Sequence, residues 1–191
     1  MPRQVWIWLR NALIVGCALA VACFGWQVTT ADAPPDGRSI DVCGFVRPET
    51  IARLVPEASE PEADIRPTNS WCEFSGWVGE GAGRKSVDLW FGYVREGRKE
   101  GASAEFQARR KVRYASCLNC NSQPTPVRIG DESFEHGWTY EEIRQFAQVR
   151  VRIGTVTVQA QLSTPYATRD ALFRATRSLA QEVAARCHAT C

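Results

Sequence analysis

Two runs of alternating apolar and polar residues, joined by a glycine, constrain the fold more than any other feature of this chain. Residues 149–153 read VRVRI and residues 156–162 read VTVQAQL. Alternation with a period of two is typical of β-strands that bury only one side. The apolar positions change parity around Gly154, as a tight turn between two paired strands requires. This segment therefore predicts an antiparallel β-hairpin.

Sequence patterns elsewhere predict six further elements around this hairpin. Alternating apolar residues favour a strand, apolar residues at spacings of three and four favour a helix, and prolines mark the boundaries of other elements. These are strands at 71–77, 87–94 and 128–134, and helices at 48–55, 103–114 and 168–186. Adjacent strands joined by tight turns form antiparallel sheets. We therefore expect an α+β fold over residues 41–191, an antiparallel sheet with packed helices.

The N-terminal segment predicts a membrane anchor over residues 1–28, followed by a linker over residues 29–40. Residues 12–28 carry no charge, and a run of roughly 17 residues is near the lower limit for crossing a bilayer. Arg3 and Arg10 lie on the N-terminal side only, so the positive-inside rule predicts that residues 29–191 are exported. Two alternatives stay open, a lipoprotein signal with Cys17 or Cys23 as the lipidated residue, and a cleaved secretory signal. All three interpretations predict a domain outside the cytoplasm.

The charge of the chain argues against nucleic-acid binding. The formal net charge is +2, and it comes from Arg3 and Arg10 in the anchor. Residues 29–191 carry 21 acidic side chains and as many basic ones. A neutral domain lacks the basic surface that attracts phosphate backbones.

Six cysteines beyond residue 40 predict a domain stabilised by disulfides in an oxidising compartment. We expect Cys43 and Cys72 to pair, which would join the start of the domain to its first strand. In the chain-entropy model, closing a loop of this length stabilises the fold by about 3.6 kcal/mol.

The remaining four cysteines, Cys117, Cys120, Cys187 and Cys191, allow four interpretations. They could form local disulfides (117–120 and 187–191) or crossed ones between the two pairs. A zinc site with His188 nearby is the third interpretation, and a thiol–disulfide redox centre at Cys117–Cys120 is the fourth. A bridge between Cys187 and Cys191 is expected only if the last helix ends near Arg186.

Apart from these cysteines, no residue set predicts catalysis, a metal site or a cofactor. His136 and His188 are expected to be solvated, His136 at a strand end or turn. Acidic neighbours such as Asp131 and Glu132 point to opposite sides of a strand, so they do not form a paired-carboxylate site.

One group of residues predicts a binding surface. If the strands share a sheet, six side chains at positions that do not face the core lie together: Asp88, Trp90, Arg150, Arg152, Gln159 and Gln161. Polar surfaces that include an aromatic ring bind ligands or partners. The alternative is that the first helix covers this side of the sheet or that water simply solvates it.

Four short motifs resemble a known family. They are residues 41–46 (DVCGFV) followed by Pro48-Glu49, residues 71–74 (WCEF), residues 129–132 (IGDE) and residues 149–154 (VRVRIG). Together they are similar to the actinobacterial envelope lipoproteins grouped as domain of unknown function 3558, over residues 41–186. The resemblance implies an exported, membrane-attached domain with a sandwich similar to that of PsbP-like proteins. It implies no known catalytic residues.

These features predict a binding or accessory module of the bacterial cell envelope, tethered to the cell membrane and without catalysis. Its partner would be an envelope protein or a small ligand. One alternative is a thiol–disulfide oxidoreductase that uses Cys117 and Cys120. The second is a structural or assembly protein held in the membrane by its anchor or by a lipid, in which small residues such as Gly16 and Ala20 could pack two anchors together.

Overall fold

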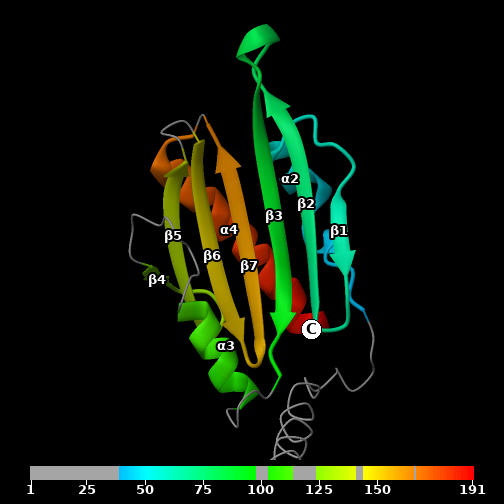
Figure 1. The fold of residues 1–191 in the computed structure, drawn as a ribbon, viewed down its shortest axis with the longest axis vertical. Helices are drawn as coiled ribbons and strands as arrows, with labels where there is room; N and C mark the ends of the chain where they lie inside the picture. Colours follow the sequence, from blue (N-terminus) through cyan, green and yellow to red (C-terminus); the bar gives the residue numbers. More distant parts are fainter. Residues whose placement is uncertain (1–38, 98–102, 114–123, 141–143, 166) are drawn as a thin grey trace, which may run out of the picture.

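The computed structural model describes residues 39–97, 103–113, 124–140, 144–165 and 167–191. Figure 1 shows its elements. In chain order they are η1 (Cys43–Phe45), α2 (Pro48–Leu54), β1 (Glu62–Ile65), β2 (Asn69–Val78), η2 (Gly81–Gly83), β3 (Lys85–Arg95), α3 (Ala104–Arg113), β4 (Thr125–Val127), β5 (Glu132–Tyr140), β6 (Arg144–Ile153), β7 (Val156–Thr164) and α4 (Arg169–Thr190). The α+β class is confirmed.

The strands form a single seven-stranded sheet in the order β1-β2-β3-β7-β6-β5-β4. Every neighbouring pair is antiparallel. The predicted hairpin is β6–β7, in which Ile153 lies opposite Val156 and Gly154 turns with a φ of 56°. The central contact, β3 with β7, joins two segments that are far apart in the sequence.

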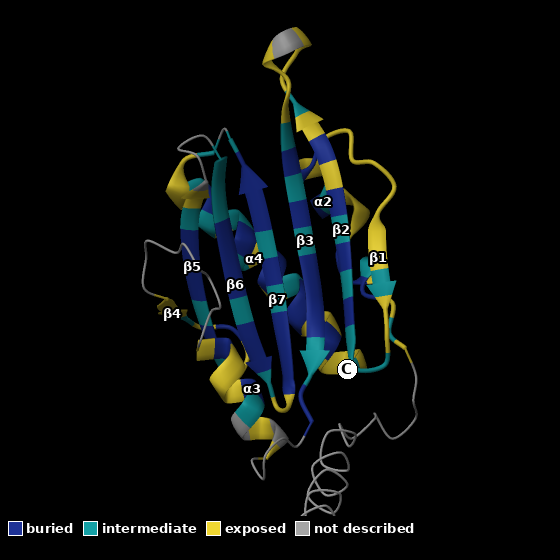
Figure 2. Ribbon diagram, viewed as in Figure 1, coloured by how far each residue is buried: buried dark blue, intermediate teal, exposed yellow. Residues whose placement is uncertain are grey.

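The core lies between one side of the sheet and the long helix α4. Phe91, Leu89 and Val149 are fully buried on this side of the sheet. They belong to the same core cluster as Leu172 and Leu179 of α4. Figure 2 shows this pattern, with buried residues running along the central strands. The predicted apolar stripe of the last helix therefore faces the sheet, as expected.

The helices cover the two sides of the sheet unequally. In Figure 1, α2 and α4 lie behind the sheet, and α3 lies in front of its lower end. α3 contacts β5, β6 and β7. The first helix therefore packs on the core side, so the alternative in which it covers the opposite side is wrong.

Two features of the strands differ from the predictions. The chain turns at residues 128–131, with Gly130 at a φ of 62°, so the predicted strand at 128–134 is replaced by β4 before the turn and β5 after it. Pro126 lies inside β4, which an edge strand tolerates because its N–H need not pair. β1 was not predicted, because its sequence EADI is short, acidic and mostly exposed.

Several sequence-based expectations lie outside the described residues. They are the anchor at 1–28, Cys17 and Cys23, and the cysteines Cys117 and Cys120. Within the part of the chain that the structure describes, no helix is both long enough and apolar enough to cross a membrane.

Candidate functional site

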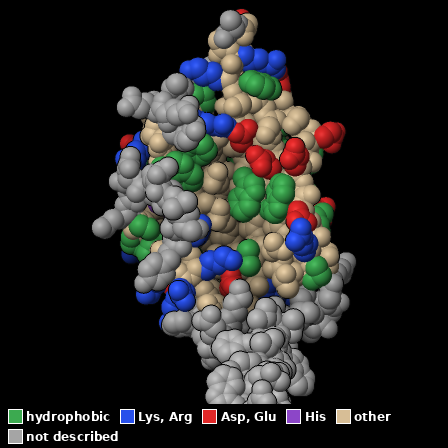
Figure 3. Space-filling view, in the orientation of Figure 1, with side chains coloured by type: hydrophobic (Ala, Val, Ile, Leu, Met, Phe, Trp, Pro, Cys, Tyr) green, Lys and Arg blue, Asp and Glu red, His purple; other side chains and the backbone are tan. Residues whose placement is uncertain are grey.

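The side of the sheet opposite α4 carries side chains quite unlike those of the core. We call it the polar face. Its members come from alternate positions of four neighbouring strands: Trp71, Glu73, Asp88, Trp90, Gln148, Arg150, Arg152, Thr157, Gln159 and Gln161. All six residues expected to share a side of the sheet lie on it. Figure 3 looks onto this face and shows hydrophobic side chains near its centre, with acidic side chains gathered on one side of them.

Cross-strand pairing arranges the polar face in rows. The row through its centre runs from Trp71 on β2 to Gly92 on β3, Gln159 on β7 and Arg150 on β6. Residues directly opposite one another in adjacent strands lie close enough to contact. Gly92 has no side chain, whereas its neighbours in the row, Trp71 and Gln159, have large ones.

Only glycine fits at position 92. A Cβ atom there would lie 2.5 Å from the Ser70 carbonyl oxygen and 2.9 Å from the Trp71 Cβ. The first of these atoms belongs to the backbone and the second is attached directly to it, so neither can move away cheaply. Glycine is therefore required at position 92 by the close approach of β2, and its backbone also lines a hollow on the face.

This hollow is a pocket of about 90 Å³. Trp71 and Trp90 line it, and both are only partly buried. Its other lining residues are Asn69, Ser70, Gly92, Tyr93, Val94, Lys111, Arg150, Thr157 and Gln159. The pocket is thus built by four strands and by one residue of α3.

Thr157 gives the pocket an unusual polar group. Its side chain lines the pocket and the residue is 4% exposed. Within the described parts of the chain, nothing forms a hydrogen bond with its Oγ1 atom. A buried hydroxyl without a partner costs about 1–3 kcal/mol of stability. Such a group in a pocket indicates a site for a ligand atom that would complete the bond.

Two cations lie at the rim of the pocket. Arg150 donates from Nε to Gln148 Oε1 at 3.2 Å and from Nη1 to the Lys111 carbonyl oxygen at 3.3 Å. Burial lowers the pKa of Arg150 from its usual value, because a low-dielectric site disfavours the charged form. Lys111 Nζ lies 2.8 Å from the carboxylate of Glu96, which is buried.

Three residues that were expected in the binding surface, Asp88, Arg152 and Gln161, lie on the polar face but do not line this pocket. Gln161 accepts a hydrogen bond from Gln148 Nε2 at 3.1 Å. Asp88 forms an ion pair with Arg144. Arg152 lies 3.3 Å from Asp131 Oδ2 and 3.7 Å from Glu132 Oε2, where it joins the turn before β5 to the hairpin. These three residues therefore have structural partners of their own.

The sequence reasoning missed Trp71, Gly92, Lys111 and Thr157. Trp71 and Thr157 alternate with core residues in their strands, so the period-2 pattern could have placed both on the polar face. Lys111 lies on α3, and its position over the sheet depends on tertiary packing. The requirement for glycine at position 92 depends on the close approach of Ser70 and Trp71 in β2, which the sequence alone does not show.

The expectation for His136 is wrong. It lies within β5, is 3% exposed, and stacks on Trp138 with ring centroids 5.6 Å apart. Burial, and secondly the charge of Arg150, lower the pKa of His136 to about 4. The imidazole is therefore neutral at pH 7. It was missed because the Gly and Trp that follow it suggested a turn, whereas they continue the strand.

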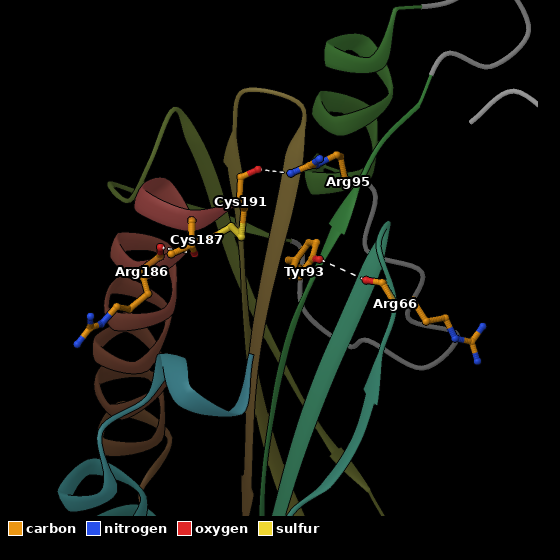
Figure 4. The surroundings of a disulfide bond; sticks show 7 residues. Arg66, Tyr93, Arg95, Arg186, Cys187 and Cys191 are labelled. Atoms are coloured by element: carbon orange, nitrogen blue, oxygen red, sulfur yellow. Dashed lines mark hydrogen bonds between the residues drawn. A yellow bond between two sulfur atoms is a disulfide. The ribbon is translucent and has the colours of Figure 1, made fainter. Parts of the chain in front are cut away.

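Two disulfides are present in the described residues. Cys43–Cys72, as predicted, joins η1 to β2 with Cα atoms 5.3 Å apart. Cys187–Cys191 closes the last turn of α4 with Cα atoms 4.8 Å apart (Figure 4). The condition that the helix should end near Arg186 is wrong, because α4 continues to Thr190 and the bridge joins its last turn to the C-cap residue Cys191.

The pairing of Cys187 with Cys191 limits what these two cysteines can do. Their sulfur atoms are bonded to each other. In this structure these two cysteines therefore form neither a crossed bridge nor a shared zinc site. Arg95 of β3 donates a hydrogen bond to the Cys191 carbonyl oxygen, which holds the end of α4 against the sheet (Figure 4). Among the described residues, no group of three His, Cys, Asp or Glu side chains could hold a metal ion.

A larger open groove of about 630 Å³ lies on the core side, between α2 and β2. Apolar side chains such as Ile51, Val55 and Phe74 form much of its lining. Of the described side chains that line it, none has a buried polar atom without a partner. The pocket on the polar face therefore carries the stronger indication of a ligand.

Comparisons with protein-family models, with curated proteins and with solved structures found no match. The resemblance to the family of envelope lipoproteins stays a prediction, based on its four motifs.

Proposed function

We propose that this protein is a binding module of the bacterial cell envelope, without catalytic activity, that holds a ligand or partner on its polar face. One observation carries the proposal. Two partly exposed tryptophans, Trp71 and Trp90, border a pocket that contains a cation at Arg150 and a buried hydroxyl at Thr157 that forms no hydrogen bond with any described residue. Pockets with aromatic walls and a few polar groups are typical of ligand-binding sites.

The chemistry of the polar face supports binding in preference to catalysis. Asp88 forms an ion pair with Arg144, and Arg152 with Asp131. His136 is buried with a pKa of about 4, so it is far from the value near 7 that suits general acid–base catalysis. The groups closest to the pocket therefore suit recognition of a charged or polar ligand.

The location is proposed on separate grounds. Disulfides persist in compartments outside the cytoplasm, and the domain contains two in its described residues. The uncharged segment at residues 12–28 would tether the domain to the cell membrane, with the domain on the outer side. We further propose that the fold belongs with the sandwiches of PsbP-like proteins, on the strength of the sequence motifs.

Site-directed photo-crosslinking tests the proposal. A photoreactive phenylalanine analogue replaces Trp90 in the full chain, expressed in the membranes of its own host. The matched control carries the analogue at Gln181, which is exposed on α4, on the opposite side of the sheet. We expect adducts of defined mass from position 90 and none from position 181. We also expect Trp71→Ala to abolish them, because Trp71 lines the same pocket.

Trp77→Ala is the control variant for the loss of adducts that we expect in Trp71→Ala. Trp77 lies on the same side of β2 but is 49% exposed and does not line the pocket. Its replacement should leave the adducts unchanged. Adducts that persist in the folded Trp71→Ala variant, or that form equally from position 181, would contradict a binding site on the polar face.

A further inference from the structure

We infer that the pocket on the polar face binds a neutral six-membered sugar ring, with one side of the ring against the tryptophans and its hydroxyl groups toward the polar side chains of the pocket. This ligand class rests on the proposed function and makes it more specific. Three properties of the pocket carry it: its aromatic walls, the kind of polar groups between them and the internal partners of its charged groups.

Trp71 and Trp90 give the pocket two aromatic surfaces. Trp71 lies opposite Gly92, and Trp90 lies two residues before Gly92 on β3, so the two side chains stand at diagonal positions of one strand pair. Diagonal neighbours lie roughly 7–8 Å apart, which is within reach of aromatic side chains. The C–H groups on one side of a sugar ring are apolar and pack on an aromatic face, while the hydroxyl groups at its edge stay available for hydrogen bonds.

The size of the pocket suits a single ring. A closed apolar cavity of about 150 Å³ accommodates benzene. This pocket has about 90 Å³, and the tryptophans that line it are only partly buried. One sugar ring can therefore enter it with part of its edge in solvent.

The uncharged polar groups of the pocket both donate and accept hydrogen bonds. Thr157 contributes a hydroxyl, and Asn69 and Gln159 contribute amides. The hydroxyl groups of a sugar also donate and accept, so they match these groups in either direction. The Thr157 hydroxyl is buried and forms no hydrogen bond with any described residue, so a sugar hydroxyl would supply the partner that it lacks.

The two charged side chains that line the pocket have partners within the protein. Lys111 forms an ion pair with Glu96. Arg150 donates to Gln148 Oε1 and to the Lys111 carbonyl oxygen. Recognition of an ion depends on a complementary charge that is directed at it, whereas a neutral ligand leaves these contacts in place. The balanced charge of residues 29–191 likewise gives no long-range attraction for ions.

A neutral sugar ring has two sources, a free sugar and the end unit of a glycan in the cell envelope. The pocket itself takes one ring. The second ring of a glycan would extend past Trp90 toward Glu73, which lies directly opposite Trp90 on β2. The Glu73 carboxylate is an acceptor for hydroxyl groups at that point.

Titration of the full chain, followed by NMR of its indole N–H groups, tests the inference. The detergent must lack a sugar headgroup, and single Trp→Phe variants assign the signals. The probes are the methyl glycosides of glucose, galactose and mannose. The matched negative probe is tetrahydropyran-2-methanol, which keeps the six-membered ring and lacks the ring hydroxyl groups.

We expect at least one methyl glycoside to shift the signals of Trp71 and Trp90, with a dissociation constant on the order of 1 mM for a ligand of this size. It should bind about fivefold or more tightly than the negative probe, because a site that bonds hydroxyl groups rejects an analogue without them. Raising the NaCl concentration from about 0.01 M to about 0.1 M should not weaken it, since screening acts on charged ligands.

The disaccharides maltose and cellobiose distinguish the two sources. If either binds about tenfold or more tightly than methyl glucoside, the ligand is a glycan that extends beyond the pocket. Equal affinities assign a free sugar.

Two variants locate the effect. Thr157→Val keeps the shape of the side chain and removes the hydroxyl, so we expect sugar binding to weaken about fivefold or more with no loss of stability. Gln159→Leu, which removes an amide of the pocket, should also weaken it. Neither change should affect the negative probe. Trp77→Ala, outside the pocket, should leave sugar binding unchanged.

Two results would overturn the inference. One is that tetrahydropyran-2-methanol binds as well as every sugar. The second is that no sugar shifts the signals of Trp71 or Trp90. In either case, persistent crosslinking from position 90 would show that the polar face still binds something else, and the proposed function would stand. Loss of the crosslinks as well would remove both.

Discussion

Gly92 lines the pocket at a point where the close approach of β2 requires glycine. We predict that Gly92→Ala destabilises the fold by about 2 kcal/mol, because the added Cβ meets the backbone of β2 and forces it to shift. Gly44→Ala is the matched control, since a Cβ there has no atom within 4 Å. Urea denaturation of the two full-chain variants measures the difference. Equal stabilities would show that β2 and β3 can separate at this point without cost.

His136 makes the stability of the domain depend on pH. Its pKa of about 4 in the folded state lies below the value of about 6.5 for an unfolded histidine. The unfolded chain therefore binds the proton first, and stability is lost as the pH falls from about 6.5 to about 4. By linkage the loss from this one group is at most about 3 kcal/mol.

The His136→Phe variant isolates this effect from the titration of acidic residues. Phenylalanine retains a ring that can stack on Trp138 but has no titratable group. The free energy of unfolding of the wild type should fall more steeply than that of the variant between pH 6.5 and pH 4. If the two pH profiles run parallel, His136 does not have the depressed pKa.

For single residues, the sequence predicts which side of the sheet a side chain faces better than it predicts what surrounds that side chain. Alternation was enough to place Trp90 and Gln159 on one side of the sheet. The burial of His136 was not predictable, because it depends on Trp138 and on the neighbouring strand β6. The need for glycine at position 92 likewise depends on Trp71. Trp71 lies opposite Gly92 on β2 and 21 residues earlier in the chain.

At the scale of elements, Glu182 joins α2 to α4. It accepts hydrogen bonds from the Arg47 backbone N–H at 2.8 Å, from Arg47 Nε at 2.9 Å and from the Thr50 hydroxyl at 3.0 Å. Burial is the largest single influence and would raise the pKa of Glu182, but these bonds and the Arg47 charge together lower it. The contribution of Glu182 to stability is therefore present near neutral pH and is lost as acid protonates it.

We predict that Glu182→Gln destabilises the fold by about 1–2 kcal/mol at pH 7, because an amide cannot replace the charged acceptor. The neighbouring change Gln181→Ala, at an exposed position, should cost less than about 0.5 kcal/mol. Chemical denaturation at pH 7 and pH 3 measures both. A penalty for Glu182→Gln that is as large at pH 3 as at pH 7 would contradict a role for its charge.

The elements differ in how far the sequence predicted them. The β6–β7 hairpin and α4 have long periodic patterns, and both were found where expected, although α4 continues past residue 186 to Thr190. β4 and β5 were misplaced because Pro126 and Gly130, usually signs of irregular structure, belong to an edge strand and to the turn between two strands. The pairing of β3 with β7 has no local signal, because the two strands meet only when the whole sheet forms.

At the scale of the whole molecule, the Cys43–Cys72 disulfide connects the start of the domain to the sheet. Its loop spans 29 residues, against 4 for Cys187–Cys191. In the chain-entropy model, these loops contribute about 3.6 and about 2 kcal/mol. We predict that replacing Cys43 and Cys72 together by alanine lowers the free energy of unfolding more than replacing Cys187 and Cys191 together. The reverse order, measured by denaturation under non-reducing conditions, would contradict this.

The class of the fold was predictable because one side of the sheet and one side of α4 are predominantly apolar. The pocket was not, because it needs contributions from β2, β3, β6, β7 and α3 at once. The groups that line it, such as Thr157, Arg150 and the tryptophans, come from separate segments of the chain, and no single segment contains all of these.

Native mass spectrometry of the full chain, purified gently from the membranes of its host, tests the central claim most directly. We predict a fraction of the wild type with an added small mass, the same fraction in Trp77→Ala, and its loss in Thr157→Val. Compared with the wild type, Thr157→Val lacks a single buried hydroxyl and Trp77→Ala lacks a single exposed ring. If Thr157→Val retains the added mass in the same proportion as the wild type, the pocket on the polar face is not the binding site.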